Sequence, residues 1–205
     1  MARLLAERLQ FRFLDTGAMY RAVALAVLKA AVDENDCNAV ARIVRDCSIR
    51  FDGDQLLLNG EVVSAEIRMP EVTAVSSIVA SNPAVRERLV ELQREIGSAG
   101  KMVTEGRDQG TVVFPDAQHK FFVTASLDAR ARRRQRELAV KEVHLPFETV
   151  LEQLRLRDER DETRAHAPMI PAVDATIVDT SDLTIVQVVD TLVRRIQNEL
   201  APKKS

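Results

Sequence analysis

The sequence predicts an α/β fold, in which a parallel sheet is flanked by helices on both faces. Short apolar stretches, typical of buried strands, end in polar residues, and longer stretches with apolar residues at helical spacing separate them. One segment with two tight-turn signals breaks this alternation and predicts a small antiparallel sheet. The 205 residues can bury a substantial core, so we expect one main domain over residues 1–205.

The first elements are a helix, a strand and two further helices. Residues 1–9 carry apolar side chains at helical spacing, although no capping residue precedes them. A short apolar strand is expected within residues 11–17, and an apolar stripe predicts a helix over residues 18–32. Residues 38–47 predict another short helix.

The small antiparallel sheet is expected over residues 48–64. In this segment Asp52-Gly53 and Asn59-Gly60 separate runs of alternating apolar residues. Such dipeptides favour the tight turns of hairpins, so the segment predicts a meander.

Two helices follow the meander. The first has Pro70 near its start, and the second is marked by Asn82 as an N-cap and Pro83 in its first turn. We expect Gly97 and Gly100 to end the second helix.

Strands and helices alternate again in the second half of the chain. KMVTEG at 101–106 and HKFFVTAS at 119–126 predict buried strands, and Ser126 can cap the arginine-rich helix that begins around Leu127. The remaining expected elements are a helix over 147–163, a strand over 175–181 and a helix from about Asp182.

The polar ends of the expected strands predict the position of a ligand site. Ligands of parallel sheets collect beyond the carboxyl ends of the strands, so these ends should line one rim. The four ends are Asp15-Thr16-Gly17, Glu105-Gly106-Arg107-Asp108, Thr124-Ala125-Ser126 and Asp179-Thr180-Ser181.

The composition excludes several classes of protein. A net charge of −2 with 46% hydrophobic residues argues against disorder and against general affinity for nucleic acid or membranes. Cys37 and Cys47 form neither a disulfide framework nor a zinc motif, and no apolar run is long enough for a membrane span. The three histidines lack metal-ligand spacing. We therefore expect a cytosolic protein.

Arginines are the most informative polar residues. One group lies at 130–136, and Arg157, Asp161 and Arg164 are spaced to share one face of a helix. Each group alone is typical of a solvated helix face with weak ion pairs. Together with arginines at the expected rim, they indicate a polyanionic ligand, because guanidinium groups bind phosphate through two parallel hydrogen bonds.

Four segments together resemble the bacterial cytidylate kinases of the nucleoside-monophosphate kinase group. They are LDTGAMYR at 14–21, LNGEVVSAEIR at 58–68, EGRDQGTVVFPDA at 105–117 and RDERDETRAHAP at 157–168. The resemblance covers nearly the whole chain and implies a kinase-like α/β fold with a CMP-binding insertion at 48–95 and a helical lid at 126–145. It also implies transfer of the γ-phosphoryl group of ATP to CMP or dCMP with Mg²⁺, by a monomer.

The resemblance assigns roles to individual residues. Arg21 and Arg107, with Thr16 nearby, would hold the phosphate of CMP, and Arg157 and Asp161 would contact the sugar. Arg107 and Arg157 would also act at the reacting phosphates. The cytosine would be surrounded by Ser77, Arg86, Asp108 and Arg164. A carboxylate such as Asp108 accepts from the cytosine amino group, which uracil lacks.

The lid is expected to act on the donor nucleotide. Its arginines Arg130, Arg133 and Arg134 would close over the phosphates of ATP and exclude water.

One family feature is not found among residues 1–205. Members of the family carry an N-terminal strand and a loop of the form G-x-x-x-x-G-K-[GST], whereas none of the seven glycines here forms such a loop. We expect that Met1 is an internal residue or a misassigned start of a cytidylate kinase. The alternatives are a truncated, non-catalytic protein that keeps the CMP pocket, a kinase for another acceptor such as UMP, and an RNA-binding module using the arginines at 130–136.

Overall fold

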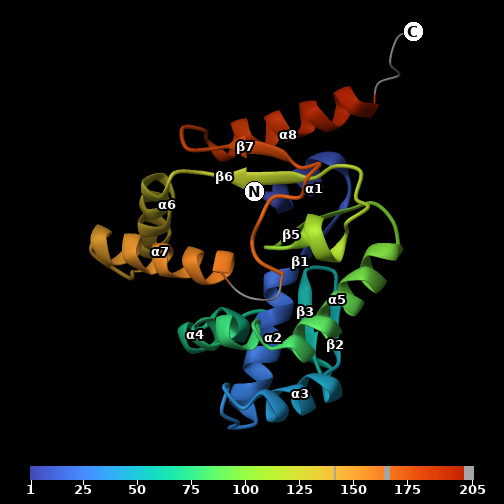
Figure 1. The fold of residues 1–205 in the computed structure, drawn as a ribbon, viewed down its shortest axis with the longest axis vertical. Coiled ribbons are helices and arrows are strands. Elements are labelled where there is room, and N and C mark those ends of the chain that lie inside the picture. The colour runs from blue at the N-terminus through green and yellow to red at the C-terminus, as the bar shows by residue number, and fades with distance from the viewer. Residues whose placement is uncertain (141, 164–166, 201–205) are drawn as a thin grey trace. The chain divides into compact units, whose positions relative to one another are not determined.

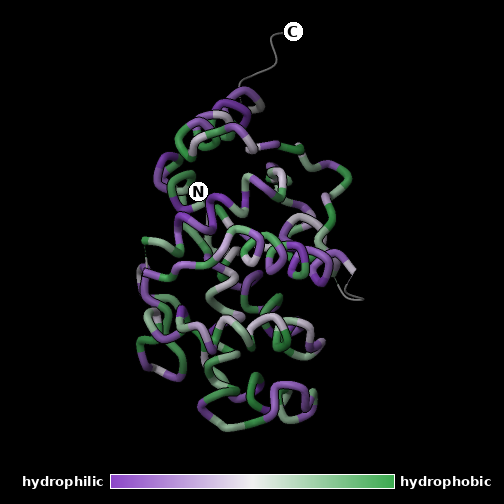
Figure 2. The backbone as a smooth tube through the Cα atoms, turned by 90° about the vertical axis from the view of Figure 1, so that its left-hand side faces the viewer, coloured by the Kyte–Doolittle hydropathy of each residue, from purple (hydrophilic) through white to green (hydrophobic). Residues whose placement is uncertain are grey.

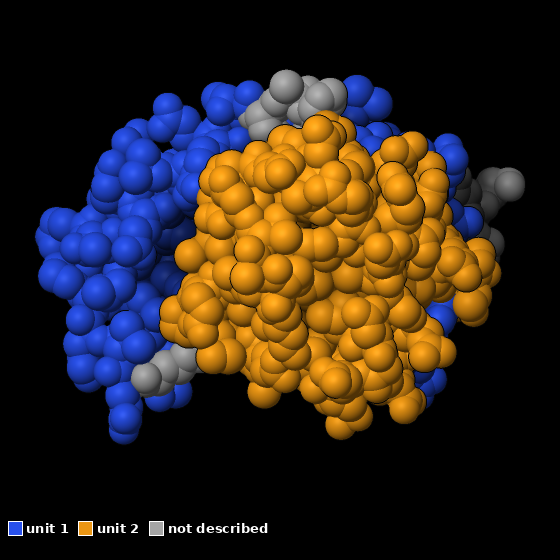
Figure 3. Space-filling model, turned by 90° about the horizontal axis from the view of Figure 1, so that it is seen from below, with its two compact units in different colours: residues 1–12, 107–205 blue, residues 13–106 orange. Residues whose placement is uncertain are grey.

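Residues 1–140, 142–163 and 167–200 are described in a computed structural model of the chain. The chain divides into two units, which Figure 3 colours separately. Unit 1 comprises Met1–Arg12 and Arg107–Ser205, and unit 2 comprises Phe13–Gly106.

Unit 2 is built around helix α2 (Thr16–Lys29), which packs against three other helices (Figure 1). These are α3 (Cys37–Asp46), α4 (Pro70–Val79) and α5 (Pro83–Ser98). The buried face of α2 is apolar and consists mostly of small side chains, so neighbouring helices can approach closely. Met19, Ala22 and Val23 on this face are fully buried.

Two small sheets complete unit 2. Strands β1 (Arg12–Asp15) and β5 (Met102–Glu105) pair, with only the first residue of β1 assigned to unit 1. The predicted meander is confirmed by β2 (Ile49–Asp52), β3 (Gln55–Leu58) and β4 (Glu61–Val62), which pair antiparallel. Asn59 and Gly60 have φ of 53° and 90°, as a tight hairpin turn requires.

The start of α5 confirms the predicted cap. Asn82 accepts a hydrogen bond from the Ala84 amide at 3.0 Å, and its side-chain amide donates to the Cys37 carbonyl at 3.0 Å. The predicted helix end is only partly right, because Gly97 lies inside α5. Gly100, with φ of 126°, lies just beyond the helix in a conformation that favours glycine.

Asn82→Ala is expected to lower the free energy of unfolding by about 2 kcal/mol. The cap and the hydrogen bond to Cys37 each contribute about 1 kcal/mol, and Asn82 is buried. Asn82→Ser keeps a capping oxygen and is expected to lose about half as much. Urea unfolding of both variants measures the difference, and equal losses would contradict the capping role.

Unit 1 combines a two-stranded parallel sheet with helices. Strands β6 (Phe121–Thr124) and β7 (Thr176–Asp179) lie side by side, with Phe121 opposite Thr176 (Figure 1). The helices are α1 (Ala2–Leu9), α6 (Leu127–Val140), α7 (Phe147–Thr163) and α8 (Ile185–Leu200), of which α1 packs on α8 and α6 on α7.

The predicted α/β class is confirmed, with parallel and antiparallel strands and flanking helices. The strands outside the meander do not form the one parallel sheet that the sequence predicts, however. Within the described residues β1 bonds only β5 and β6 only β7, so each pair is a sheet of its own.

The last helix begins later than predicted. Helix α8 starts at Ile185 rather than around Asp182, because Thr184 and Gln187 hydrogen-bond reciprocally at the helix start. This Thr-x-x-Gln arrangement is a capping box, a signal present in the sequence.

Apolar and polar residues alternate along the helices in the hydropathy-coloured view (Figure 2). Over the described ranges, no helix combines the length and apolar character needed to cross a membrane.

Candidate functional site

The ends of β1 and β5 meet in unit 2, as predicted for two of the four polar strand ends. The Thr16 hydroxyl donates to the Glu105 carbonyl at 2.6 Å, and Thr16 is buried. Asp15 caps α2 by accepting from the Ala18 amide at 2.8 Å. The predicted phosphate-binding residues Thr16 and Arg21 therefore lie on the first turns of one helix whose start is fixed by two hydrogen bonds.

Arg21 is held at this helix start by Asp15. Its Nη2 lies 3.4 Å from both carboxylate oxygens of Asp15, and its side chain is only 25% exposed. Burial lowers the pKa of Arg21 from its ordinary value, a change that the charge of Asp15 opposes and that of Arg68 reinforces. Among the described residues the buried Arg21 Nε has no hydrogen-bond partner, so this guanidinium keeps unused donors.

Gly17 leaves room for this pair. A Cβ at Gly17 would lie 3.2 Å from Arg21 Nη1 and 3.4 Å from Asp15 Oδ1. A larger residue would therefore crowd the guanidinium, which explains why glycine suits this position.

The other predicted residues of unit 2 lie on separate helices. Ser77 is exposed on α4, and Arg86 is buried on α5 with 7% of its surface exposed.

In unit 1 the structure brings together Arg107, Arg157 and Asp161. Arg107 Nε lies 2.9 Å from Asp161 Oδ2, and Arg157 Nε lies 3.9 Å from the same oxygen. The predicted shared helix face is confirmed for Arg157 and Asp161. Arg164, predicted on the same face, lies outside the described residues.

Asp108 is the most buried predicted side chain of unit 1, with 4% of its surface exposed. Its backbone carbonyl accepts from the Val112 amide at 2.9 Å, at the start of a single π-helical turn, η2 (Gln109–Val113). Such turns are rare in proteins, but those that occur are often found at functional sites. This one fixes the backbone of Asp108.

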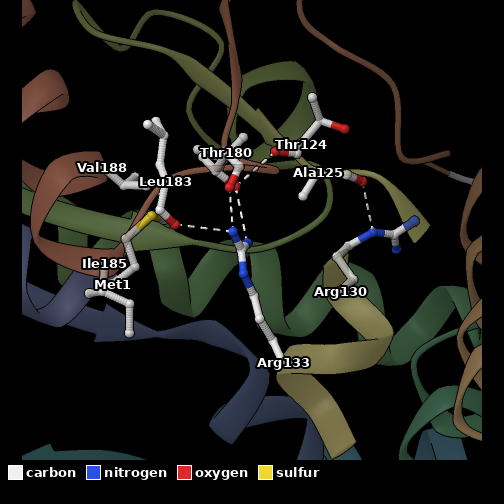
Figure 4. Close-up of a pocket in the computed structure, with 10 residues that line it drawn as sticks. Met1, Thr124, Ala125, Arg130, Arg133, Thr180, Leu183, Ile185 and Val188 are labelled. Carbon is white, nitrogen blue, oxygen red and sulfur yellow. Dashed lines mark hydrogen bonds between the residues drawn. The ribbon is translucent and has the colours of Figure 1, made fainter. Parts of the chain in front are cut away.

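A pocket of about 250 Å³ lies in unit 1 at the ends of β6 and β7 (Figure 4). Thr180 donates to the Thr124 carbonyl at 2.9 Å, and the Ser126 amide donates to the Ser181 hydroxyl at 2.8 Å. The other two polar strand ends therefore also meet. The pocket is lined by Met1, Val123, Thr124, Ala125, Arg130, Arg133, Thr180, Leu183, Ile185 and Val188.

Two of the three predicted lid arginines line this pocket. Arg133 reaches across it to donate to the Thr180 hydroxyl at 3.2 Å and to the Leu183 carbonyl at 3.2 Å. Arg130 donates to the Ala125 carbonyl and pairs with Asp158 at 2.6 Å. Arg134 is instead directed to Glu137 at 3.3 Å, an exposed pair of the kind that contributes little stability.

No group of three or more histidine, cysteine, aspartate or glutamate side chains forms a potential metal site in the described part of the chain. Sequence reasoning gave no role to two residues of these clusters, Asp158, which pairs with Arg130, and Arg68, which lies 3.8 Å from Asp15. Both lie in segments that carry the family resemblance, but no pattern singled them out within those segments.

Comparison with known proteins identifies relatives along nearly the whole chain. The family model described as "Cytidylate kinase" matches residues 1–198. A protein named "Cytidylate kinase" from Pelotomaculum thermopropionicum is 46% identical over 201 residues, covering 96% of this chain and 89% of that protein. Its namesake from Mycobacterium avium is 50% identical over 193 residues, covering 92% and 85%. A third, from Geobacter sp. (strain M21), is 42% identical over 205 residues, covering 98% and 88%.

Proposed function

The chain belongs to the cytidylate kinase family, and on this premise we propose that it transfers the γ-phosphoryl group of ATP to CMP or dCMP, forming CDP or dCDP and ADP. The observation that carries the proposal is the family match over residues 1–198 together with arginines at the ends of both strand pairs. Phosphoryl transfer needs little covalent chemistry from a protein. It depends on positioning and on neutralising charge, which arginines supply.

On the acceptor side, Arg21 and Arg107 are proposed to hold the phosphate of the monophosphate. Arg21 has donors that its partner Asp15 does not use, which supports this role. Asp161 is proposed to accept from the sugar hydroxyls, with Arg157 beside it. Ser77, Arg86, Asp108 and Arg164 are proposed to contact the cytosine.

On the donor side, the pocket of unit 1 is proposed to receive ATP. Its apolar walls, which include Leu183 and Val188, suit a purine ring, and Arg130 and Arg133 at its edge suit phosphates. Mg²⁺ would enter with ATP and neutralise charge on the phosphates, since Mg²⁺ usually binds substrate phosphates with only one or two carboxylates. The segments 48–95 and 126–145 are proposed as the acceptor-binding insertion and the lid.

The proposal is tested by measuring ATP-dependent formation of nucleoside diphosphate from CMP, dCMP, UMP and AMP. We expect CMP and dCMP to be phosphorylated, with UMP and AMP at least tenfold slower, because a buried carboxylate matches the cytosine amino group. Equal rates with CMP and UMP would favour the alternative of a different acceptor.

The alternative of a non-catalytic protein that keeps the CMP pocket is tested with the same chain. It predicts CMP binding by calorimetry with no CDP formed, whereas measurable CDP formation by the 205-residue chain would reject it.

A further inference from the structure

The Asp15 carboxylate lies between two guanidinium groups of unit 2. Arg21 Nη2 is 3.4 Å from its Oδ2, and Arg68 Nη2 is 3.8 Å from the same oxygen. Asp15 also uses Oδ1 to cap α2. One carboxylate that caps a helix and faces two cations leaves both arginines incompletely neutralised.

Neither arginine makes a tight pair with Asp15. Both contacts are longer than the roughly 2.7–2.9 Å typical of charge-assisted hydrogen bonds between arginine and carboxylate. The charge of Arg68 also lowers the pKa of Arg21, while the nearby Glu105 raises it. An anion bound beside Asp15 would relieve the repulsion between the two guanidinium groups.

The fold fixes the backbone of Arg68 and leaves its side chain accessible. Arg68 ends a short 3₁₀ helix, η1 (Glu66–Arg68), that packs on α2. Ile67 is buried, and Glu66 pairs with Lys29 of α2 at 2.9 Å, so η1 is anchored from two sides. The Arg68 side chain itself is 60% exposed, and its one ionic partner among the described residues is Asp15.

We propose that Arg68 is a further phosphate-binding arginine of the acceptor site, which binds the phosphate of the nucleoside monophosphate in addition to the proposed Arg21 and Arg107. Asp15 is then a positioning residue, which holds the guanidinium groups of Arg21 and Arg68 near one point before the nucleotide arrives. A phosphate monoester carries close to two negative charges at neutral pH and matches two guanidinium groups. The inference rests on the proposed function, since that function supplies the monophosphate ligand.

Calorimetric titration of the 205-residue chain with CMP, cytidine and inorganic phosphate tests the inference. We expect Arg68→Ala to weaken CMP binding about tenfold and to leave the affinity for cytidine unchanged, because only CMP carries the phosphate. Arg68→Lys keeps the charge without the planar fork and should recover part of the loss. Arg45→Ala on α3 removes the same charge from an exposed position of the same unit and should change neither affinity.

The possible results separate the inference from the function on which it rests. If the unaltered chain binds CMP and Arg68→Ala binds it equally well, the inference is wrong and the proposed function stands. An equal loss for CMP and cytidine would show a structural role for Arg68 and also overturn the inference. If the unaltered chain does not bind CMP, the proposed function fails. In that case, titration of the unaltered chain and of Arg68→Ala with inorganic phosphate tests whether Arg68 and Arg21 bind a phosphate group together. An unchanged affinity for inorganic phosphate in Arg68→Ala would overturn the inference.

Discussion

Arg21→Ala is expected to weaken CMP binding by about a hundredfold. Arg21 is half-buried at the start of α2, where a phosphate would meet a fork of donors in a poorly solvated position. Two charge-assisted hydrogen bonds of about 1.5 kcal/mol each give about 3 kcal/mol, which corresponds to roughly two orders of magnitude in affinity. The loss should exceed that for Arg68→Ala, because Arg21 is less exposed to competing water.

Calorimetry with CMP and cytidine measures this effect and separates it from unfolding. Cytidine affinity should change little, since the nucleoside has no phosphate, and Arg21→Lys should bind CMP with intermediate affinity. A thermal unfolding transition close to that of the unaltered chain shows that α2 is intact. A change of less than threefold in CMP affinity, with the fold intact, would contradict a phosphate-binding role for Arg21.

Asp108→Asn is expected to lower the preference for CMP over UMP by about 10- to 100-fold. A carboxylate only accepts hydrogen bonds and so selects the amino group of cytosine, whereas an amide can both donate and accept and tolerates the carbonyl of uracil. The side chain of Asp108 is 4% exposed, so water cannot easily replace a lost partner.

The ratio of kcat/KM for CMP and UMP measures this preference, and the ratio of their dissociation constants does so where turnover is too slow. Asp116→Asn makes the same chemical change at an exposed position of the same unit and should leave the ratio unaltered. An unchanged ratio in Asp108→Asn would mean that base selection lies elsewhere, with Arg86 and Ser77 as the remaining described residues proposed to contact the base.

Local signals in the sequence predicted most of the helices and strands. Helix α7 occupies Phe147–Thr163 as expected, and Asn82 caps α5 through the hydrogen bond that the Asn-Pro dipeptide predicts. Both depend on contacts within a few residues. The late start of α8 was missed although its signal, the capping box at Thr184 and Gln187, is also local. The glutamine of this capping box, Gln187, lies among apolar residues and was not used as a capping signal.

The division of the strands outside the meander into two separate sheets could not be predicted from local signals. Which strand pairs with which is decided by contacts between distant parts of the chain, as when β1 pairs with β5 some ninety residues later. Alternation of strands and helices indicates a parallel arrangement but does not fix where a sheet is interrupted.

The candidate site shows the same contrast. Arg157 and Asp161 share a helix face because they are four residues apart, and sequence spacing is enough to establish this. Their partner Arg107 is distant from them in the sequence, and Arg68 is likewise distant in the sequence from its partner Asp15. The resemblance to a known family assigned a role to Arg107, which lies in the motif at 105–117. Arg68 is the last residue of the segment at 58–68, and the resemblance assigned no role to individual residues of that segment.

We expect this chain to bind CMP through its arginines and its buried carboxylate. Titration of the 205-residue chain with CMP, UMP and cytidine tests this mode of binding. The expected result is a single CMP site, with UMP and cytidine each bound at least tenfold more weakly. Equal affinity for CMP and UMP would contradict selection of the base, and equal affinity for CMP and cytidine would contradict recognition of the phosphate.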